Sequence, residues 1–137
     1  MFLYDFAIVD APIERVVDRL RSEARDILRD AAARAGGIEP TPPETGELRP
    51  RADGWALPVQ WERSGWPGPF ARLGGELEVA PVHGDRTHLS VSASWDSAGT
   101  RTTTRRESVR ARHETETVVR EFLVAAAGLL ARASVVD

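Results

Sequence analysis

Residues 85–96 read DRTHLSVSASWD, and from Leu89 to Trp95 apolar residues alternate strictly with serine. Successive side chains of a β-strand point to opposite faces, so this pattern predicts a strand with one face turned away from water. The functional question is what that apolar face contacts. The candidates are a packed core, a bound lipophilic molecule, or a substrate held beside catalytic groups.

Two earlier segments repeat the period of two. Residues 55–62 and 72–79 alternate apolar with polar or small side chains, and the turn-rich segments 64–70 and 83–86 connect the three runs. Consecutive strands with short links predict an antiparallel meander. The expected inward rows are Trp55, Leu57, Val59 and Trp61, then Leu73, Gly75, Leu77 and Val79, and finally Leu89, Val91, Ala93 and Trp95.

The N-terminal part changes period within a dozen residues. Asp10-Ala11-Pro12 marks a helix start, with an acid to cap it and proline in the first turn. Apolar residues then recur at helical spacing as far as Gly36-Gly37, where the helix is expected to end. The pattern fits one long helix, or two short ones with a bend near Ser22. Before it, residues 2–9 predict a strand whose inward side chains are Phe2, Tyr4, Phe6 and Ile8.

The remaining segments complete an α+β arrangement. Residues 38–53 are rich in proline and predict a loop with at most a short edge strand near Glu47–Arg51. Residues 97–108 are polar and predict an irregular segment. An amphipathic helix is expected from about Ser108 to Ala133. Because an antiparallel sheet with one apolar face needs a cover, this terminal helix is expected to pack across the three strands.

Composition limits the class of protein. The chain has 137 residues and a formal net charge of −3, which predicts one domain over residues 1–137 and no general attraction to nucleic acid or anionic membranes. Cysteine and lysine are absent, which excludes disulfides, cysteine-based metal sites and Schiff-base chemistry. No signal-peptide pattern opens the chain, and no stretch approaches the roughly 20 apolar residues of a membrane span. We therefore expect a cytoplasmic protein without membrane insertion.

Three stretches carry a resemblance to a known superfamily. IVDAPIERVVDRL (Ile8–Leu20) resembles its opening strand and AP-x-E-x-V helix start, and GGELEVAPVHGDRTHLSVSASWD (Gly74–Asp96) resembles its paired late strands. RARHETETVVREFLVAAAGLLARA (Arg110–Ala133) resembles its closing helix. Together they are similar to the SRPBCC or START-like superfamily. That resemblance implies a helix-grip fold, in which a curved antiparallel sheet wraps around a long C-terminal helix, with one or two short helices after the first strand.

The resemblance also implies a cavity between the sheet and the terminal helix. Members of the superfamily bind lipids, sterols, polyketides and plant hormones, and some are cyclases or dehydratases, so the fold alone does not choose a function. Gly74 and Gly75 in mid-strand either leave room for a ligand or bend the sheet. The inward rows of the three central strands carry no titratable or nucleophilic side chain, whereas general acid–base catalysis needs such a group within hydrogen-bond reach.

The leading hypothesis is therefore a non-catalytic protein that binds a lipophilic small molecule, such as a lipid or polyketide, in this cavity. Tyr4, Arg110 and His113 are expected to orient a polar end of the ligand. Tyr4 also fits a core tyrosine whose hydroxyl bonds a backbone carbonyl. No cofactor and no metal are expected. The side chains expected to supply apolar contact are Trp55, Trp61, Leu77, Val91, Trp95 and Phe122.

Two alternatives come from other classes. A polyketide cyclase or aromatase-like enzyme would use Tyr4 and His113, which requires both side chains to point into one cavity. An interaction protein would have a solid core filled by tryptophans and would act through its surface, as a monomer or homodimer. The arginines between Arg101 and Arg112 predict solvated surface, because no aromatic residues are interleaved for nucleic-acid contact. His113 and Glu116 lack a second pair of metal ligands.

Overall fold

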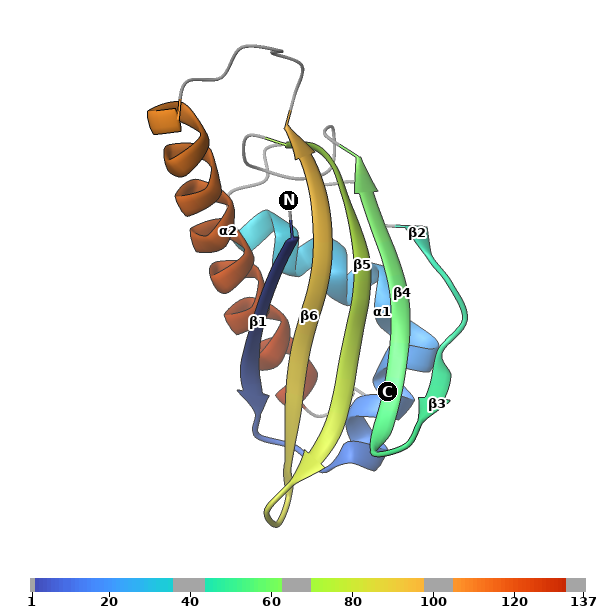
Figure 1. The fold of residues 1–137 in the computed structure, drawn as a ribbon. Helices are drawn as coiled ribbons and strands as arrows, with labels where there is room; N and C mark the ends of the chain where they lie inside the picture. Colours follow the sequence, from blue (N-terminus) through green and yellow to red (C-terminus); the bar gives the residue numbers. More distant parts are fainter. Residues whose placement is uncertain (1, 36–43, 63–69, 98–104, 133–137) are drawn as a thin grey trace.

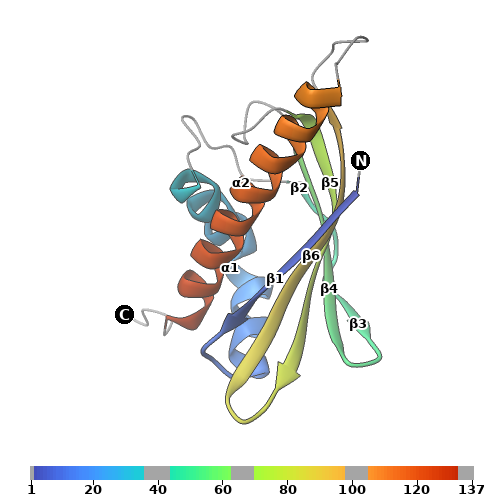
Figure 2. The ribbon, with the colours of Figure 1, turned by 60° about the vertical axis from the view of Figure 1, so that its left-hand side comes forward.

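The computed structural model describes residues 2–35, 44–62, 70–97 and 105–132. Within these ranges, strands form one sheet and two helices pack on one of its faces (Figure 1, Figure 2). In chain order the elements are β1 (Phe2–Val9), α1 (Ile13–Arg34), β2 (Glu44–Thr45), β3 (Arg49–Arg51), β4 (Gly54–Glu62), β5 (Phe70–Val82), β6 (Arg86–Ser97) and α2 (Arg105–Ala131).

The sheet is antiparallel and follows the strand order β1-β6-β5-β4-β2, with β3 paired to β4. Strands β4, β5 and β6 form the predicted meander. Their register sets the predicted inward rows side by side, because Leu57 lies opposite Leu77, which lies opposite Val91. All three side chains are buried. The predicted fold class is confirmed. Trp55 of the predicted inward rows is half-buried, and the side chains of Leu73 and Trp95 lie outside the described residues. The buried members of these rows are Leu57, Val59, Trp61, Leu77, Val79, Leu89, Val91 and Ala93.

The two helices cover the apolar face of the sheet. α2 packs across β1 and β6 and lies beside α1, while the strands curve around the helices (Figure 2). Leu20 and Leu28 of α1 and Leu123 and Leu130 of α2 are buried in one core with the inward rows. A long C-terminal helix packed on a curved antiparallel sheet is the helix-grip arrangement, as predicted.

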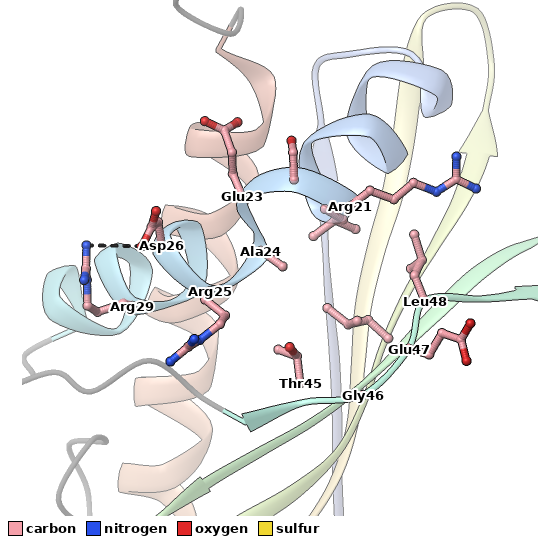
Figure 3. A pocket seen from close by; sticks show the side chains of 13 residues that line it. Arg21, Glu23, Ala24, Arg25, Asp26, Arg29, Thr45, Gly46, Glu47 and Leu48 are labelled. Atoms are coloured by element: carbon pink, nitrogen blue, oxygen red, sulfur yellow. Dashed lines mark ion pairs between the residues drawn. The ribbon is translucent and has the colours of Figure 1, made fainter.

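Helix α1 is one continuous helix that changes direction in the stretch that carries Arg21, Glu23 and Ala24 (Figure 3). The Ser22 hydroxyl donates a hydrogen bond of 3.0 Å to the carbonyl oxygen of Asp18, one turn earlier. Such a side-chain bond competes with the backbone ladder and bends helices. The structure therefore resolves the open choice in favour of a single helix with a bend.

The inward face of β1 is the reverse of the predicted one. Leu3 and Val9 are buried, and Leu3 pairs with the inward residue Ala93 of β6. Because paired residues share a face, the even-numbered residues of β1 must point outward. The prediction was wrong because apolar alternation was stronger on the face that water reaches. The exposed side chains are Phe2 (61%), Tyr4 (54%), Phe6 (45%) and Ile8 (44%).

At the edge of the sheet, polar side chains bond the backbone of β1. The Asp5 carboxylate accepts a hydrogen bond of 2.8 Å from the N–H of Phe6. Arg120 of α2 donates to the carbonyl oxygen of Phe6 at 2.6 Å and pairs with Asp5 at 3.1 Å. These contacts satisfy both backbone groups of Phe6 and tie α2 to the edge strand.

Several element boundaries differ from the predicted ones. Helix α2 begins at Arg105 and not near Ser108. Its first turn is charged and contains no apolar residue, so the spacing of apolar residues could not reveal it. The edge strand predicted near Glu47–Arg51 is β3, and the further strand β2 pairs Thr45 with Val59.

Some predicted features lie outside the described residues. They are the helix ends at Gly36-Gly37 and Ala133, the turn at residues 64–69 and most of the irregular segment, residues 98–104.

The two mid-strand glycines of β5 have different surroundings. A Cβ built on Gly75 would lie 2.0 Å from the carbonyl oxygen of Ser92 on β6, whereas one on Gly74 would meet nothing within 4 Å. Gly75 therefore permits the close approach of two strands. It does not open space for a ligand.

Candidate functional site

Two aromatic side chains pack together between the sheet and α2. Trp61 of β4 and Phe122 of α2 are both 2% exposed, and their rings meet edge to face with centroids 5.1 Å apart. Leu77 and Val91 are buried in the same cluster. Four of the predicted ligand contacts therefore lie together, but they contact one another. The side chain of Trp95 lies outside the described residues.

The three predicted polar contacts lie on the surface. Tyr4 points outward from β1, while Arg110 and His113 are exposed near the start of α2. Tyr4 lines cavities of about 270 Å³ and about 570 Å³, and His113 lines neither. The requirement of the cyclase hypothesis, both side chains in one cavity, is not met by these two cavities.

A larger hollow lies between α1 and the strands at the edge of the sheet opposite β1. We call it the α1–β2 groove, and its volume is about 830 Å³ (Figure 3). Its floor is formed by three leucines, since Leu20 and Leu57 are buried members of the core and Leu48 is half-buried against it, while most of the exposed lining is polar. The lining consists of residues 20–26 and Arg29 of α1, Thr45 of β2, residues 46–48, and Leu57 of β4.

The bend of α1 shapes this groove. Figure 3 shows the helix changing direction in the stretch that carries Arg21, Glu23 and Ala24. Thr45 and Leu48 lie across from it, on the segment that leads from β2 toward β3. A helix turn on one side and a short edge segment on the other thus enclose the hollow above Leu57.

Charged side chains form the rim of the α1–β2 groove. Glu23 pairs with Arg19 at 3.0 Å, and Asp26 pairs with Arg29 at 3.5 Å. The guanidinium of Arg21 lies 4.7 Å above the centre of the Trp55 ring, a cation–π geometry. The half-buried Trp55, a predicted ligand contact, thus supports a residue of the groove wall.

Sequence reasoning did not find the groove. Arg21, Arg25 and Arg29 recur at helical spacing, but such a row is the ordinary pattern of a solvated helix face. The sequence pattern predicts that Leu20 and Leu57 are core residues, and both are buried in the core. No local signal marks the separation between a bent helix and an edge strand, so the groove emerges only from packing.

Two other kinds of site are absent from the described ranges. No cluster of three or more histidine, aspartate or glutamate side chains there is arranged to hold a metal ion. No helix there combines the length and apolar character needed to cross a bilayer.

Comparison with known proteins identifies the fold. No family model and no curated protein matches the sequence. Among solved structures, the Zhui aromatase/cyclase from Streptomyces sp. R1128 is similar with a TM-score of 0.57 and 14% identity, covering 98% of each chain. A conserved protein from Geobacillus kaustophilus has a TM-score of 0.52 and 15% identity, over 93% of this chain and 95% of that one.

A third similar structure is Ara h 8.0201, with a TM-score of 0.50 and 8% identity over 95% of this chain and 97% of that one. At these identities the likeness is one of fold. Nearly the whole of each chain is superposed, so the similarity concerns the complete architecture. The chain has the helix-grip fold that the sequence predicted.

Proposed function

We propose that this helix-grip protein binds a lipophilic small molecule in the α1–β2 groove, without catalysing a reaction on it. The observation that carries the proposal is a groove of about 830 Å³ with an apolar floor. Ligand sites typically have about 300–1,000 Å³ and combine apolar walls with a few polar groups. Leu20, Leu48 and Leu57 provide the walls, and the α1 side chains provide the polar groups.

The proposed location differs from the one expected between the sheet and α2. Trp61 and Phe122 support the proposal only indirectly, as the packed layer that keeps the inner face of the sheet rigid. Trp55 contributes through Arg21, which stacks on its ring. Rigid walls favour binding, because a preformed groove loses little conformational entropy when a ligand enters.

The ion pairing of carboxylates in the groove favours binding over catalysis. Of the three carboxylates that line the groove, Glu23 and Asp26 pair with Arg19 and Arg29. A general base must instead be free to reach a proton of the substrate. Glu47 has no ion pair among the described residues, but it is exposed to water and extends toward the same end of the groove as Arg21 (Figure 3). The name of the similar aromatase/cyclase raises the enzymatic alternative, but in this chain Tyr4 lies on the opposite face of the sheet from both helices.

Native mass spectrometry of the freshly purified protein tests the proposal, with a thermal-shift panel of fatty acids, sterols and aromatic polyketides. We expect a non-covalent adduct of a few hundred daltons, or a raised melting temperature with one ligand class. The half-buried Ala24 lines the groove and the exposed Ala33 does not. Ala24→Trp should abolish the adduct or the shift, and Ala33→Trp should retain it. A wild-type protein with neither adduct nor shift would refute the proposal.

A second candidate function, protein interaction, is favoured by the exposed row Phe2, Tyr4, Phe6 and Ile8 on β1. A contiguous apolar row of this kind is typical of contact surfaces. Sedimentation velocity over a range of concentrations tests this candidate in its simplest form, self-association. A dimer that Tyr4→Arg dissociates would support it, and a monomer at every concentration would argue against a homodimer.

A further inference from the structure

The charges around the α1–β2 groove are unequally compensated. Arg29 is shared by Asp26 at 3.5 Å and Asp30 at 3.7 Å, and Glu23 pairs with Arg19 at 3.0 Å. Arg25 lies on α1 between these two pairs. It makes no ion pair or hydrogen bond with any residue in ranges 2–35, 44–62, 70–97 and 105–132. One exposed cation at the groove is therefore without a partner in the described structure.

Arg25 lies at a different end of the groove from the other charges that lack an ion pair. Figure 3 shows the Arg21 and Glu47 side chains extending toward one end, while Arg25 extends toward the other. Arg21 and Glu47 carry opposite charges, and Arg21 is stacked on Trp55. The hydroxyl-bearing side chain of Thr45 also lines the groove. One end thus holds a cation and an anion, and the other holds a guanidinium that has no partner among the described residues.

We propose that the groove selects lipophilic carboxylates, whose anionic end binds Arg25 while the apolar part contacts Leu20, Leu48 and Leu57. This inference rests on the proposed function. A guanidinium offers two parallel N–H donors that match the two oxygens of a carboxylate.

Three probes with one chain length and different head groups test the proposal: dodecanoate, dodecanol and dodecylammonium. Each displaces the neutral dye Nile red from the protein at neutral pH, below its micelle concentration. We expect dodecanoate to bind about 10-fold more tightly than dodecanol, and dodecylammonium more weakly than either. The advantage of dodecanoate should shrink as salt is added, because Arg25 is exposed.

Variants test whether the preference for dodecanoate depends on Arg25 or on other surface charges. Arg25→Gln should reduce the affinity for dodecanoate to that for dodecanol and leave dodecanol unchanged, while Arg25→Lys should restore part of the difference. Arg15→Gln is the matched control, since Arg15 is an exposed α1 residue outside the groove lining. Equal binding of dodecanoate and dodecanol, or an unchanged preference in Arg25→Gln, overturns this inference and leaves the proposed function intact. Failure of Nile red and all three probes to bind overturns both.

Discussion

At the scale of single residues, Arg19 joins the two helices. Its side chain is 11% exposed, pairs with Glu23 at 3.0 Å, and donates hydrogen bonds to the carbonyl oxygens of Leu129 and Arg132, the latter at 2.8 Å. The last carbonyls of a helix lack partners within it and carry partial negative charge. Arg19 therefore satisfies the end of α2 from the middle of α1.

Replacing Arg19 should show how much these contacts between α1 and α2 contribute to stability. Arg19→Met keeps most of the apolar stem but removes every donor, so the free energy of unfolding should fall by about 2 kcal/mol. Chemical denaturation followed by circular dichroism measures the change. Arg15→Met, on the exposed side of the same helix, should change stability by less than about 0.5 kcal/mol. Equal effects of both variants would show that the carbonyl bonds of Arg19 contribute nothing specific.

Gly75 offers a second test at this scale. A Cβ there would overlap the carbonyl oxygen of Ser92, at 2.0 Å, so Gly75→Ala should force β5 and β6 apart. We expect a loss of more than about 2 kcal/mol in the free energy of unfolding. Gly74→Ala meets open space and should be neutral or slightly stabilising, because alanine lowers the entropy of the unfolded chain. Denaturation midpoints of the two variants that coincide would contradict this reasoning.

At the scale of elements, the edge strand β1 shows how the sheet is protected. An exposed edge offers unpaired backbone groups to other chains, and native proteins commonly place charges there. Asp5 and Arg120 occupy the backbone groups of Phe6. The exposed apolar row on the same strand makes this protection more important, because a second chain could otherwise pair along it.

Arg120→Ala should uncover this edge. The pair is exposed, so the free energy of unfolding should fall by less than about 1 kcal/mol. Self-association should nevertheless increase, visible as faster growth of light scattering in concentrated, gently heated samples. Arg112→Ala is the matched control, because it removes an exposed ion pair with Glu116 on the same helix. If both variants scatter light alike, Arg120 does not protect the edge.

At the scale of the whole molecule, one core joins the sheet to both helices. Val91 lies in the centre of this core, 4% exposed, opposite Asp5 of β1 and Leu77 of β5. The α1–β2 groove lies at its margin, where Leu20 and Leu57 belong both to the core and to the groove floor. Stability and the proposed binding site therefore share residues, and a change in the core should reach the groove.

A charged residue placed in the core tests whether β6 packs against the helices in this single core. Val91→Arg forces a long charged side chain into the packed core and should cost several kcal/mol, which removes the cooperative unfolding transition. Val124→Arg, at a position 55% exposed on α2, should unfold close to the wild type. Differential scanning calorimetry distinguishes the two. A Val91→Arg protein with an unchanged transition would show that β6 does not face the helices.

Most of the fold was predictable from local pattern. The alternation in Trp55–Trp61 and Leu89–Val91 predicts strands with defined inward faces, and the structure buries Leu57, Leu77 and Val91 as expected. The start of α1 after Asp10-Ala11-Pro12 follows from the rigid backbone of proline and needs no tertiary context. The predicted capping role of Asp10 is wrong, because Pro12 is the N-cap, just before the first turn, and no side chain bonds the helix start. The helix-grip arrangement followed from resemblance, and the similar solved structures agree with it.

What the sequence determined by itself is therefore the type and order of the elements, because propensity and period act over a few neighbouring residues. The tertiary structure alone decided the rest. Pairing with β6 turned Tyr4 outward, since a strand with two apolar faces does not specify which one is buried. Trp61 and Phe122 were brought together edge to face, and the bend of α1 left a groove beside Arg25. A hollow is the volume that packed side chains leave unfilled, so no local stretch of sequence encodes it.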